Sequence, residues 1–351
     1  MSWDFKPSEP EKTSDQVVRK ADIVYIADPH VSYSPPVGRT ALPFTEPFRD
    51  KMDWLLQEVR PDTVVVGGDL THRKTRQGLP NPSWQAIETW ARIFRDYSTT
   101  KWLLLPGNHD LINNSIRHWQ QTPLGVLSEM PNVTVFGVPE HEIAVTHKHG
   151  IQFFGVPGDH DLEEYSRLAE AGEIFVKAGS AHVAVAHSWI GHAAPYATIE
   201  PEAASSFYEV PLVLCGHIHT KFDWSGSGRR IVSTGPFVRR TVVERSQRPR
   251  AICMLADSLL NGDNSVNGVW EQPLPYKNDW KLDDAAVETL HLTLEDVVAE
   301  AGEGFGMIDS SNFEKQLAEF IAANMADVPD PITAAAIAVL REACTDESAG
   351  D

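Results

Sequence analysis

Short apolar runs separated by polar or amphipathic stretches occupy the chain from about residue 21 to residue 255. Most runs have apolar residues at successive positions, which is typical of β-strands buried on both faces. The predicted strands are Ile23–Ala27, Thr63–Val66, Trp102–Leu105, Val133–Val138, Ile151–Val156, Val183–Ala186, Leu212–Cys215 and Ile231–Ser233.

Helical periodicity separates the first three strands. One helix is predicted over residues 44–60, before Pro61, from an apolar face of Phe48, Met52, Leu55, Leu56 and Val59. Another is predicted over residues 82–97 from an apolar face of Trp84, Ile87, Ala91 and Phe94. This alternation indicates an α/β fold, and the shortage of long helices between the later strands predicts a partly mixed sheet.

Metal-capable side chains follow five of the predicted strands, each at the point where the strand ends. They are Asp28, His30, Asp69, Asn108, His187, His217 and His219. Ligands of open α/β sheets bind beyond the carboxyl ends of the strands, so we expect these side chains to converge. The alternative is a set of caps and turn formers, which would not have to keep in phase with five strands.

Imidazoles, carboxylates and a carboxamide together suit divalent transition metals, whereas calcium and magnesium prefer all-oxygen sites. We predict two divalent ions, with Mn2+ expected and Fe2+, Zn2+ or Mg2+ as alternatives. Two cations roughly 3.5 to 4 Å apart can clamp a phosphate and activate a water molecule. Asp69 is the candidate bridging ligand. His109 is the candidate proton donor to the leaving oxygen, with Asp110 orienting its ring.

These motifs together resemble, in the same order, those of the calcineurin-like metallophosphoesterases. The matching residues are Asp28-Pro29-His30, Gly67-Gly68-Asp69, Gly107-Asn108-His109-Asp110, His187 and Gly216-His217-Ile218-His219. The resemblance implies a four-layer α/β/β/α sandwich of two mixed sheets flanked by helices, with His109 as the catalytic histidine. It also implies two metal sites, one formed by Asp28, His30, Asp69 and His219 and the other by Asp69, Asn108, His187 and His217.

Further matches resemble the SbcD-type DNA repair nucleases and their bacteriophage relatives. Residues 68–72 are similar to the Gly-Asp-Leu-Phe-His of that group except at Thr71, and residues 233–240 are similar to its Gly-Ser-x-x-Arg except at Pro236. Val31-Ser32 depart from the usual residues after Asp-x-His. The resemblance implies a DNA exonuclease or endonuclease that works beside an SbcC-like ATPase on another chain, and a homodimer is a further expectation.

Charge is distributed unevenly along the 351 residues, whose formal net charge is −19. Residues 257–351 carry 20 acids and 4 bases, so the rest of the chain is nearly balanced. Seven arginines lie within residues 229–250, where they can follow a phosphate backbone, and a second basic group lies at residues 73–76. Arg239 and His72 are the candidate substrate contacts. Alternatively, the arginines pair with the acidic region or are solvated, and His72 is an exposed loop residue.

Three regions are expected along the chain: a flexible lead over residues 1–20, the catalytic domain over 21–255, and an acidic linker with a small helical appendage over 256–351. Apolar faces at residues 313–321 and 331–340 predict two helices that form either a cap or a docking element for a partner. The three scattered cysteines, and the lack of an apparent signal peptide or membrane segment, favour a cytoplasmic protein.

Two other functions stay open at this stage. A phosphodiesterase for a small or cyclic nucleotide, or a phosphoprotein phosphatase, would use the same metal chemistry on a different substrate. A non-catalytic binding protein could retain the fold, but it would have no need for His109.

Overall fold

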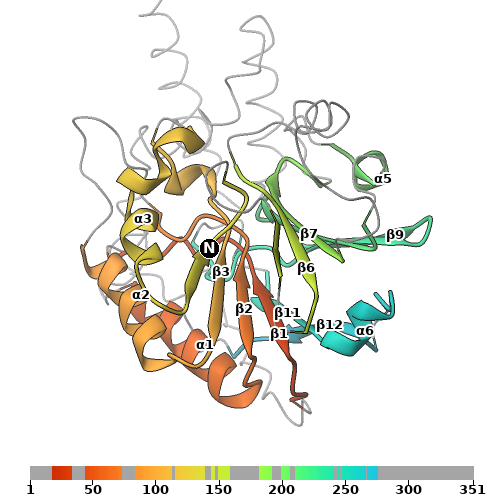
Figure 1. Cartoon of the computed structure of the whole chain (residues 1–351), viewed down its shortest axis with the longest axis horizontal. Coiled ribbons are helices and arrows are strands. Elements are labelled where there is room, and N and C mark those ends of the chain that lie inside the picture. Colours follow the sequence, from red (N-terminus) through yellow and green to blue (C-terminus); the bar gives the residue numbers. More distant parts are fainter. Residues whose placement is uncertain are drawn as a thin grey trace, which may run out of the picture.

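Two six-stranded mixed sheets form the body of the part of the chain that the structure describes (Figure 1). The computed structural model describes residues 18–33, 44–72, 84–112, 115–138, 144–146, 149–158, 182–191, 199–205, 210–240, 244, 247–265 and 267–275. The first sheet has the order β12 (Val269–Pro273), β11 (Arg250–Met254), β1 (Ile23–Ile26), β2 (Thr63–Val66), β3 (Lys101–Leu104) and β4 (Val133–Val135). The second has the order β5 (Ala144–Thr146), β6 (Gln152–Val156), β7 (Val183–Ser188), β8 (Leu212–His217), β10 (Arg229–Ser233) and β9 (Phe222–Gly226).

Each sheet contains four adjacent parallel strands, and the two sheets pack face to face. Ile23 and Tyr25 of β1 share one buried cluster with Val183 and Val185 of β7. The intervening residues of β1 belong to a different cluster, on the helical side of the sheet. Because successive side chains of a strand point to opposite faces, burial on both faces explains why these strands are apolar at every position.

Helices cover the outer faces of both sheets. Helices α1 (Thr45–Glu58), α2 (Trp84–Asp96) and α3 (Pro123–Ser128) lie beside the first sheet (Figure 1). Helix α5 (Pro201–Ala204) packs Ala204 into the apolar cluster on the outer face of the second sheet. Helix, sheet, sheet and helix therefore follow in layers, which confirms the predicted four-layer α/β/β/α sandwich.

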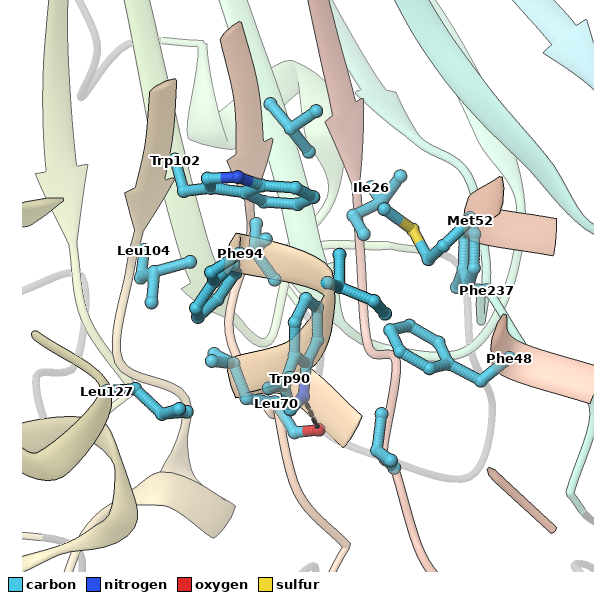
Figure 2. Close-up of a cluster of buried hydrophobic side chains, with 14 of the residues drawn as sticks. Ile26, Phe48, Met52, Leu70, Trp90, Phe94, Trp102, Leu104, Leu127 and Phe237 are labelled. Atoms are coloured by element: carbon cyan, nitrogen blue, oxygen red, sulfur yellow. Dashed lines mark hydrogen bonds between the residues drawn. The ribbon is translucent and has the colours of Figure 1, made fainter. Parts of the chain in front are cut away.

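An aromatic cluster joins α1 and α2 to the first sheet (Figure 2). The Trp90 ring lies 4.7 Å from that of Phe48 and 5.3 Å from that of Phe94, measured between ring centroids. Trp90 Nε1 also donates a hydrogen bond of 3.1 Å to the carbonyl oxygen of Leu70. Because Leu70 directly follows Asp69, this bond connects the helical layer to the end of β2.

All eight predicted strands and both predicted helices are present, but one residue of the second helix was placed wrongly. Trp84 was expected on the apolar face, yet its side chain is 77% exposed. It is the first residue of α2, and burial begins only at Ala86. The strands β5, β9, β11 and β12 were not predicted.

The acidic linker expected from residue 256 contains regular secondary structure in its described part. Helix α6 (Ala256–Leu260) occupies its beginning, and β12 pairs with β11 at the edge of the first sheet. The sheet therefore continues past residue 255, where the linker was expected to begin. The two helices predicted at 313–321 and 331–340, and most of the predicted lead over 1–20, lie outside the described residues. In the described parts of the chain, every helix is too short or too polar to cross a bilayer.

Replacing Trp90 by phenylalanine should destabilise the fold. The change removes the donor to Leu70 and part of a fully buried side chain, so we expect a loss of roughly 1–3 kcal/mol in the free energy of unfolding. Thermal unfolding followed by circular dichroism should show a midpoint lowered by several degrees. Trp84→Phe, the same change at the exposed end of the same helix, should leave the midpoint within about 1 °C. Equal effects of the two substitutions would contradict the assigned packing.

Candidate active site

The carboxyl ends of strands from both sheets meet at one place. The first sheet brings Asp28 and His30 after β1, Asp69 after β2, and Asn108 and His109 after β3. The second sheet brings His187 near the end of β7, and His217 and His219 at the end of β8. A 2.9 Å hydrogen bond from the His217 backbone N–H to Asp28 Oδ1 joins the two sets. The predicted convergence of the seven side chains is therefore present.

The backbone is strained at the site. Among the described residues, those other than glycine with a positive φ include Asp28, His30, Asp69 and His217. Such conformations cost of order 1–3 kcal/mol each and are kept only where the surrounding structure holds them. Their concentration at the strand ends is typical of a functional site.

Two glycines of the motifs allow the strand ends to approach one another closely. A Cβ atom on Gly68, whose φ is +100°, would lie 2.2 Å from His187 Nδ1. A Cβ atom on Gly107 would lie 2.1 Å from Asp69 Oδ1. Since real Cβ atoms do not approach other atoms this closely, the glycines before Asp69 and Asn108 are a steric requirement of the site.

Asp28, His30 and His219 form one group that can hold a metal ion. The Nε2 atoms of the two histidines lie 3.0 Å apart, and His219 Nε2 lies 4.0 Å from Asp28 Oδ1. Asp28 Oδ2 and His30 Nδ1 are buried and have no hydrogen-bond partner among the described residues. An unpartnered buried carboxylate oxygen is costly, so the group fits a bound cation better than a purely structural role.

Asp69, His187 and His217 form the second group, and Asn108 lies within it. Asn108 Oδ1 lies 3.0 Å from His187 Nε2 and 3.1 Å from His217 Nδ1. The other ring nitrogen of His187, Nδ1, donates to the carbonyl oxygen of Gly67 at 2.8 Å. This bond fixes the ring so that Nε2 faces the group, as the tautomer of a metal ligand requires.

The Asp69 carboxylate lies between the two groups. Its Oδ2 is 3.3 Å from His30 Nε2, and its Oδ1 is 3.4 Å from His187 Nε2. Its Oδ1 also accepts a 2.9 Å hydrogen bond from the backbone N–H of His109. One carboxylate oxygen therefore faces each group, an arrangement that allows Asp69 to bridge two metal ions.

The groups perturb one another's protonation. Burial raises the pKa of Asp69, but the nearby His187, His109 and His30 outweigh it and hold the pKa well below its usual value. Burial lowers the pKa of His187, but the charge of Asp69 outweighs it and brings the pKa to about 9. Burial also lowers the pKa of His219, but the charge of Glu244 outweighs it and brings the pKa to about 9. The carboxylates thus attract positive charge, and a binding metal ion would displace these protons.

His109 lies beside this centre, 4.7 Å from His30 between ring centroids. Its Nδ1 is hydrogen bonded to the backbone carbonyl oxygen of His72. Because a carbonyl only accepts hydrogen bonds, Nδ1 carries a proton and Nε2 is the nitrogen available for other chemistry. The half-buried His72 ring stacks on that of His109 with a centroid distance of 5.6 Å, so the alternative that His72 is an exposed loop residue is wrong.

The predicted role of Asp110 is wrong. Its carboxylate accepts hydrogen bonds from the backbone N–H groups of Gly107, Leu70 and Thr71, at 3.0, 3.1 and 3.3 Å. It therefore joins the loops after β2 and β3, and the His72 carbonyl takes the place beside Nδ1 of His109. Burial, followed by the charge of Asp69, raises the pKa of Asp110 to about 7.

Several arginines of the 229–250 cluster are used inside the fold. Arg230 is 5% exposed and binds both carboxylate oxygens of Asp223, at 3.0 and 2.8 Å. Arg250 pairs with Glu271 at 2.6 Å. Arg239, the candidate substrate contact, is buried at 6% exposure. Glu271 belongs to the acidic region over residues 257–351, so Arg250 pairs as the alternative predicted, whereas the partner of Arg230 lies outside that region. Arg245 and residues 73–76 lie outside the described residues.

Residues near the site that were not predicted include Glu244 and Trp189. Glu244 Oε1 accepts a hydrogen bond from His219 Nδ1 at 2.5 Å. The half-buried Trp189 packs edge-to-face against His217, with ring centroids 4.2 Å apart. Glu244 belongs to no strand-end motif, and Trp189 only follows one at a distance of two residues. A buried acid twenty-five residues after His219, the last histidine of the motifs, carries no signal in a single sequence.

Known proteins resemble parts of this chain. Mouse Transmembrane protein 62 is 24% identical over 188 residues, which cover 46% of this chain, and the chain spans about a quarter of that protein (27%). Among solved structures, an archaeal phosphodiesterase is 12% identical with a TM-score of 0.36, over 72% of this chain and 99% of that one. A protein from Staphylococcus aureus described as a candidate 5′-nucleotidase is 10% identical with a TM-score of 0.41, over 76% of this chain and 56% of that one.

A family model covers the stretch of the chain that contains all seven metal-capable side chains at the strand ends. The calcineurin-like phosphoesterase model matches residues 21–221, more than half of the chain. This chain therefore belongs to the calcineurin-like phosphoesterase family.

Proposed function

We propose that this phosphoesterase hydrolyses phosphodiester bonds in DNA with two bound divalent metal ions, in the manner of an SbcD-type nuclease. The observation that carries the two-metal part is the Asp69 carboxylate, which turns one oxygen toward each of the two ligand groups. Asp28, His30, Asp69 and His219 would hold one ion. Asp69, Asn108, His187 and His217 would hold the other, and Mn2+ is the ion that we expect.

When bound, the two ions supply positive charge that binds the phosphate and lowers the pKa of a water molecule. The chain's own residues supply orientation and a proton. The His109 backbone N–H donates to Asp69, and its Nδ1 is held by the His72 carbonyl. The first contact fixes the His109 backbone and the second fixes its ring, so that Nε2 of a protonated His109 would give its proton to the leaving oxygen.

DNA is proposed as the substrate because of the residues that follow Asp69. The Gly68-Asp69-Leu70-Thr71-His72 sequence resembles that of SbcD-type nucleases, and the fold places His72 against His109. His72 is thus close enough to the catalytic histidine to contact the strand beside the reacting phosphate. An SbcC-like ATPase subunit and a homodimer are further proposals that come from the resemblance alone.

Purified protein loaded with Mn2+ should release nucleotides or short fragments from single-stranded or double-stranded DNA. The same preparation should be tested on bis-p-nitrophenyl phosphate, a small phosphodiester that needs no DNA contacts. Hydrolysis of both substrates is the expected result. Turnover of the small ester with intact DNA would refute the nuclease and favour a small-molecule phosphodiesterase, and inactivity on both would favour a non-catalytic protein.

Replacing His109 by asparagine should lower the rate of hydrolysis about 10²–10⁴-fold, because the leaving oxygen loses its proton donor. The bound metal content should stay that of the unmodified chain, since His109 is not one of the proposed ligands. Rates are to be measured under saturating Mn2+. His118→Asn, at an exposed histidine, is the matched control and should keep full activity. An active His109→Asn variant would exclude His109 as the acid.

Replacing Asp69 by asparagine should remove metal binding at both groups, because the bridging ligand loses its negative charge and one of its two anionic oxygens. Elemental analysis after gel filtration should find about two ions per unmodified chain and fewer than one in the variant. Asp257→Asn, at an exposed aspartate of α6, should keep both ions. Retention of both ions by Asp69→Asn would show that this carboxylate is no bridge.

A further inference from the structure

A buried carboxylate outside the family's motifs lies against one of the two metal groups. Glu244 is 2% exposed, and its Oε1 accepts a 2.5 Å hydrogen bond from His219 Nδ1. Its other oxygen, Oε2, accepts from the backbone N–H of Arg240. Burying a carboxylate is costly unless its oxygens are hydrogen bonded, and these two bonds meet that requirement.

Two further contacts attach the same part of the chain to His219 and to His30, the other histidine of this metal group. The side-chain amide of Gln247 donates to the carbonyl oxygen of His219. The guanidinium of Arg240 donates to the carbonyl oxygen of His30 at 3.3 Å. The Gln247 backbone N–H donates to the Glu244 carbonyl oxygen at 2.9 Å, which joins these side chains to one another. Arg240, Glu244 and Gln247 are the clamp residues.

The clamp residues contact both histidines of the group that contains Asp28. Since the Nε2 atoms of His30 and His219 lie 3.0 Å apart, an ion bound there needs both rings at fixed positions. His187 in the other group is held in a different way, by the carbonyl oxygen of Gly67 at the end of β2. The two metal groups therefore have different supports.

The chemistry at Glu244 requires a carboxylate. The backbone N–H of Arg240 is a donor, and His219 Nδ1 must also donate if Nε2 is to keep its lone pair for a metal ion. Two donors converge on one side chain, and a carboxylate offers an acceptor to each. A glutamine would have one oxygen and one NH₂ group, so it would satisfy one donor and oppose the other.

We propose that Glu244 is a positioning residue for the ion held by Asp28, His30 and His219, and that the clamp residues set the affinity of that ion alone. A carboxylate hydrogen bonded to a ligating histidine fixes its tautomer and makes it a stronger ligand, and losing such a partner typically weakens metal binding 10–100-fold. The inference rests on the proposed two-metal function only in that two ions bind. It does not depend on the substrate.

The test is a titration of the metal-free chain with Mn2+. Calorimetry measures the affinity of each ion, and electron paramagnetic resonance shows whether the bound ions are coupled. The unmodified chain should bind two ions and show the spectrum of a coupled pair. Glu244→Ala should bind one ion with unchanged affinity and the other about 10–100-fold more weakly, so that an uncoupled single-ion spectrum appears at low Mn2+. Glu244→Gln should weaken the same ion. Glu129→Gln, at an exposed glutamate, should match the unmodified chain.

A double substitution decides whether Glu244 acts through His219. His219→Ala should weaken the same ion, and adding Glu244→Ala to it should weaken that ion little further, because the partner of Glu244 is already gone. Three outcomes would each overturn the proposal. Glu244→Ala could bind both ions with full affinity, it could weaken the binding of both ions equally, or the losses of affinity could be additive in the double variant. Thermal unfolding shows whether each variant is folded. If Glu244→Ala does not fold, the Mn2+ affinities of Glu244→Gln test the proposal in its place. An unmodified chain that binds fewer than two ions would instead overturn the two-metal function.

Discussion

The position of the Asp69 carboxylate is the constraint on which the rest of the site depends. Its two oxygens lie 3.3 and 3.4 Å from imidazole nitrogens of the two ligand groups. A small rotation of the carboxylate would therefore move one oxygen away from its ligand group. The His109 N–H bonds one oxygen, and the absence of a side chain on Gly107 leaves room for it. Strain in the Asp69 backbone is held by these neighbours.

The layered fold makes that position possible. Parallel strands of both sheets end at the same place, so side chains more than 150 residues apart in the sequence meet without a long loop. Apolar packing between the sheets holds the strand ends rigidly, and the Asp110 carboxylate joins the loops after β2 and β3. The ligands are thus placed on strand ends, which are more rigid supports than free loops.

The sequence predicted what is encoded locally. Strands buried on both faces are apolar throughout, and the polar residues at their ends are conspicuous against that pattern, so β1 to β3 and the seven metal-capable side chains could be found. Strand β12 could not, because Val269–Pro273 contains a glutamate, a glutamine and a proline and follows a stretch rich in Asn, Gly and Asp. The partners of Asp110 and Glu244 are backbone groups and one histidine brought together only by folding, so neither contact leaves a pattern in the chain.

The most direct measurement of the central claim is a crystal structure of the chain soaked in Mn2+, with data collected at the manganese absorption edge. We expect two anomalous peaks roughly 3.5 to 4 Å apart, with Asp69 in contact with both. One peak should lie among Asp28, His30 and His219, and the other among Asn108, His187 and His217. A single peak, or a pair of peaks not bridged by Asp69, would contradict this expectation.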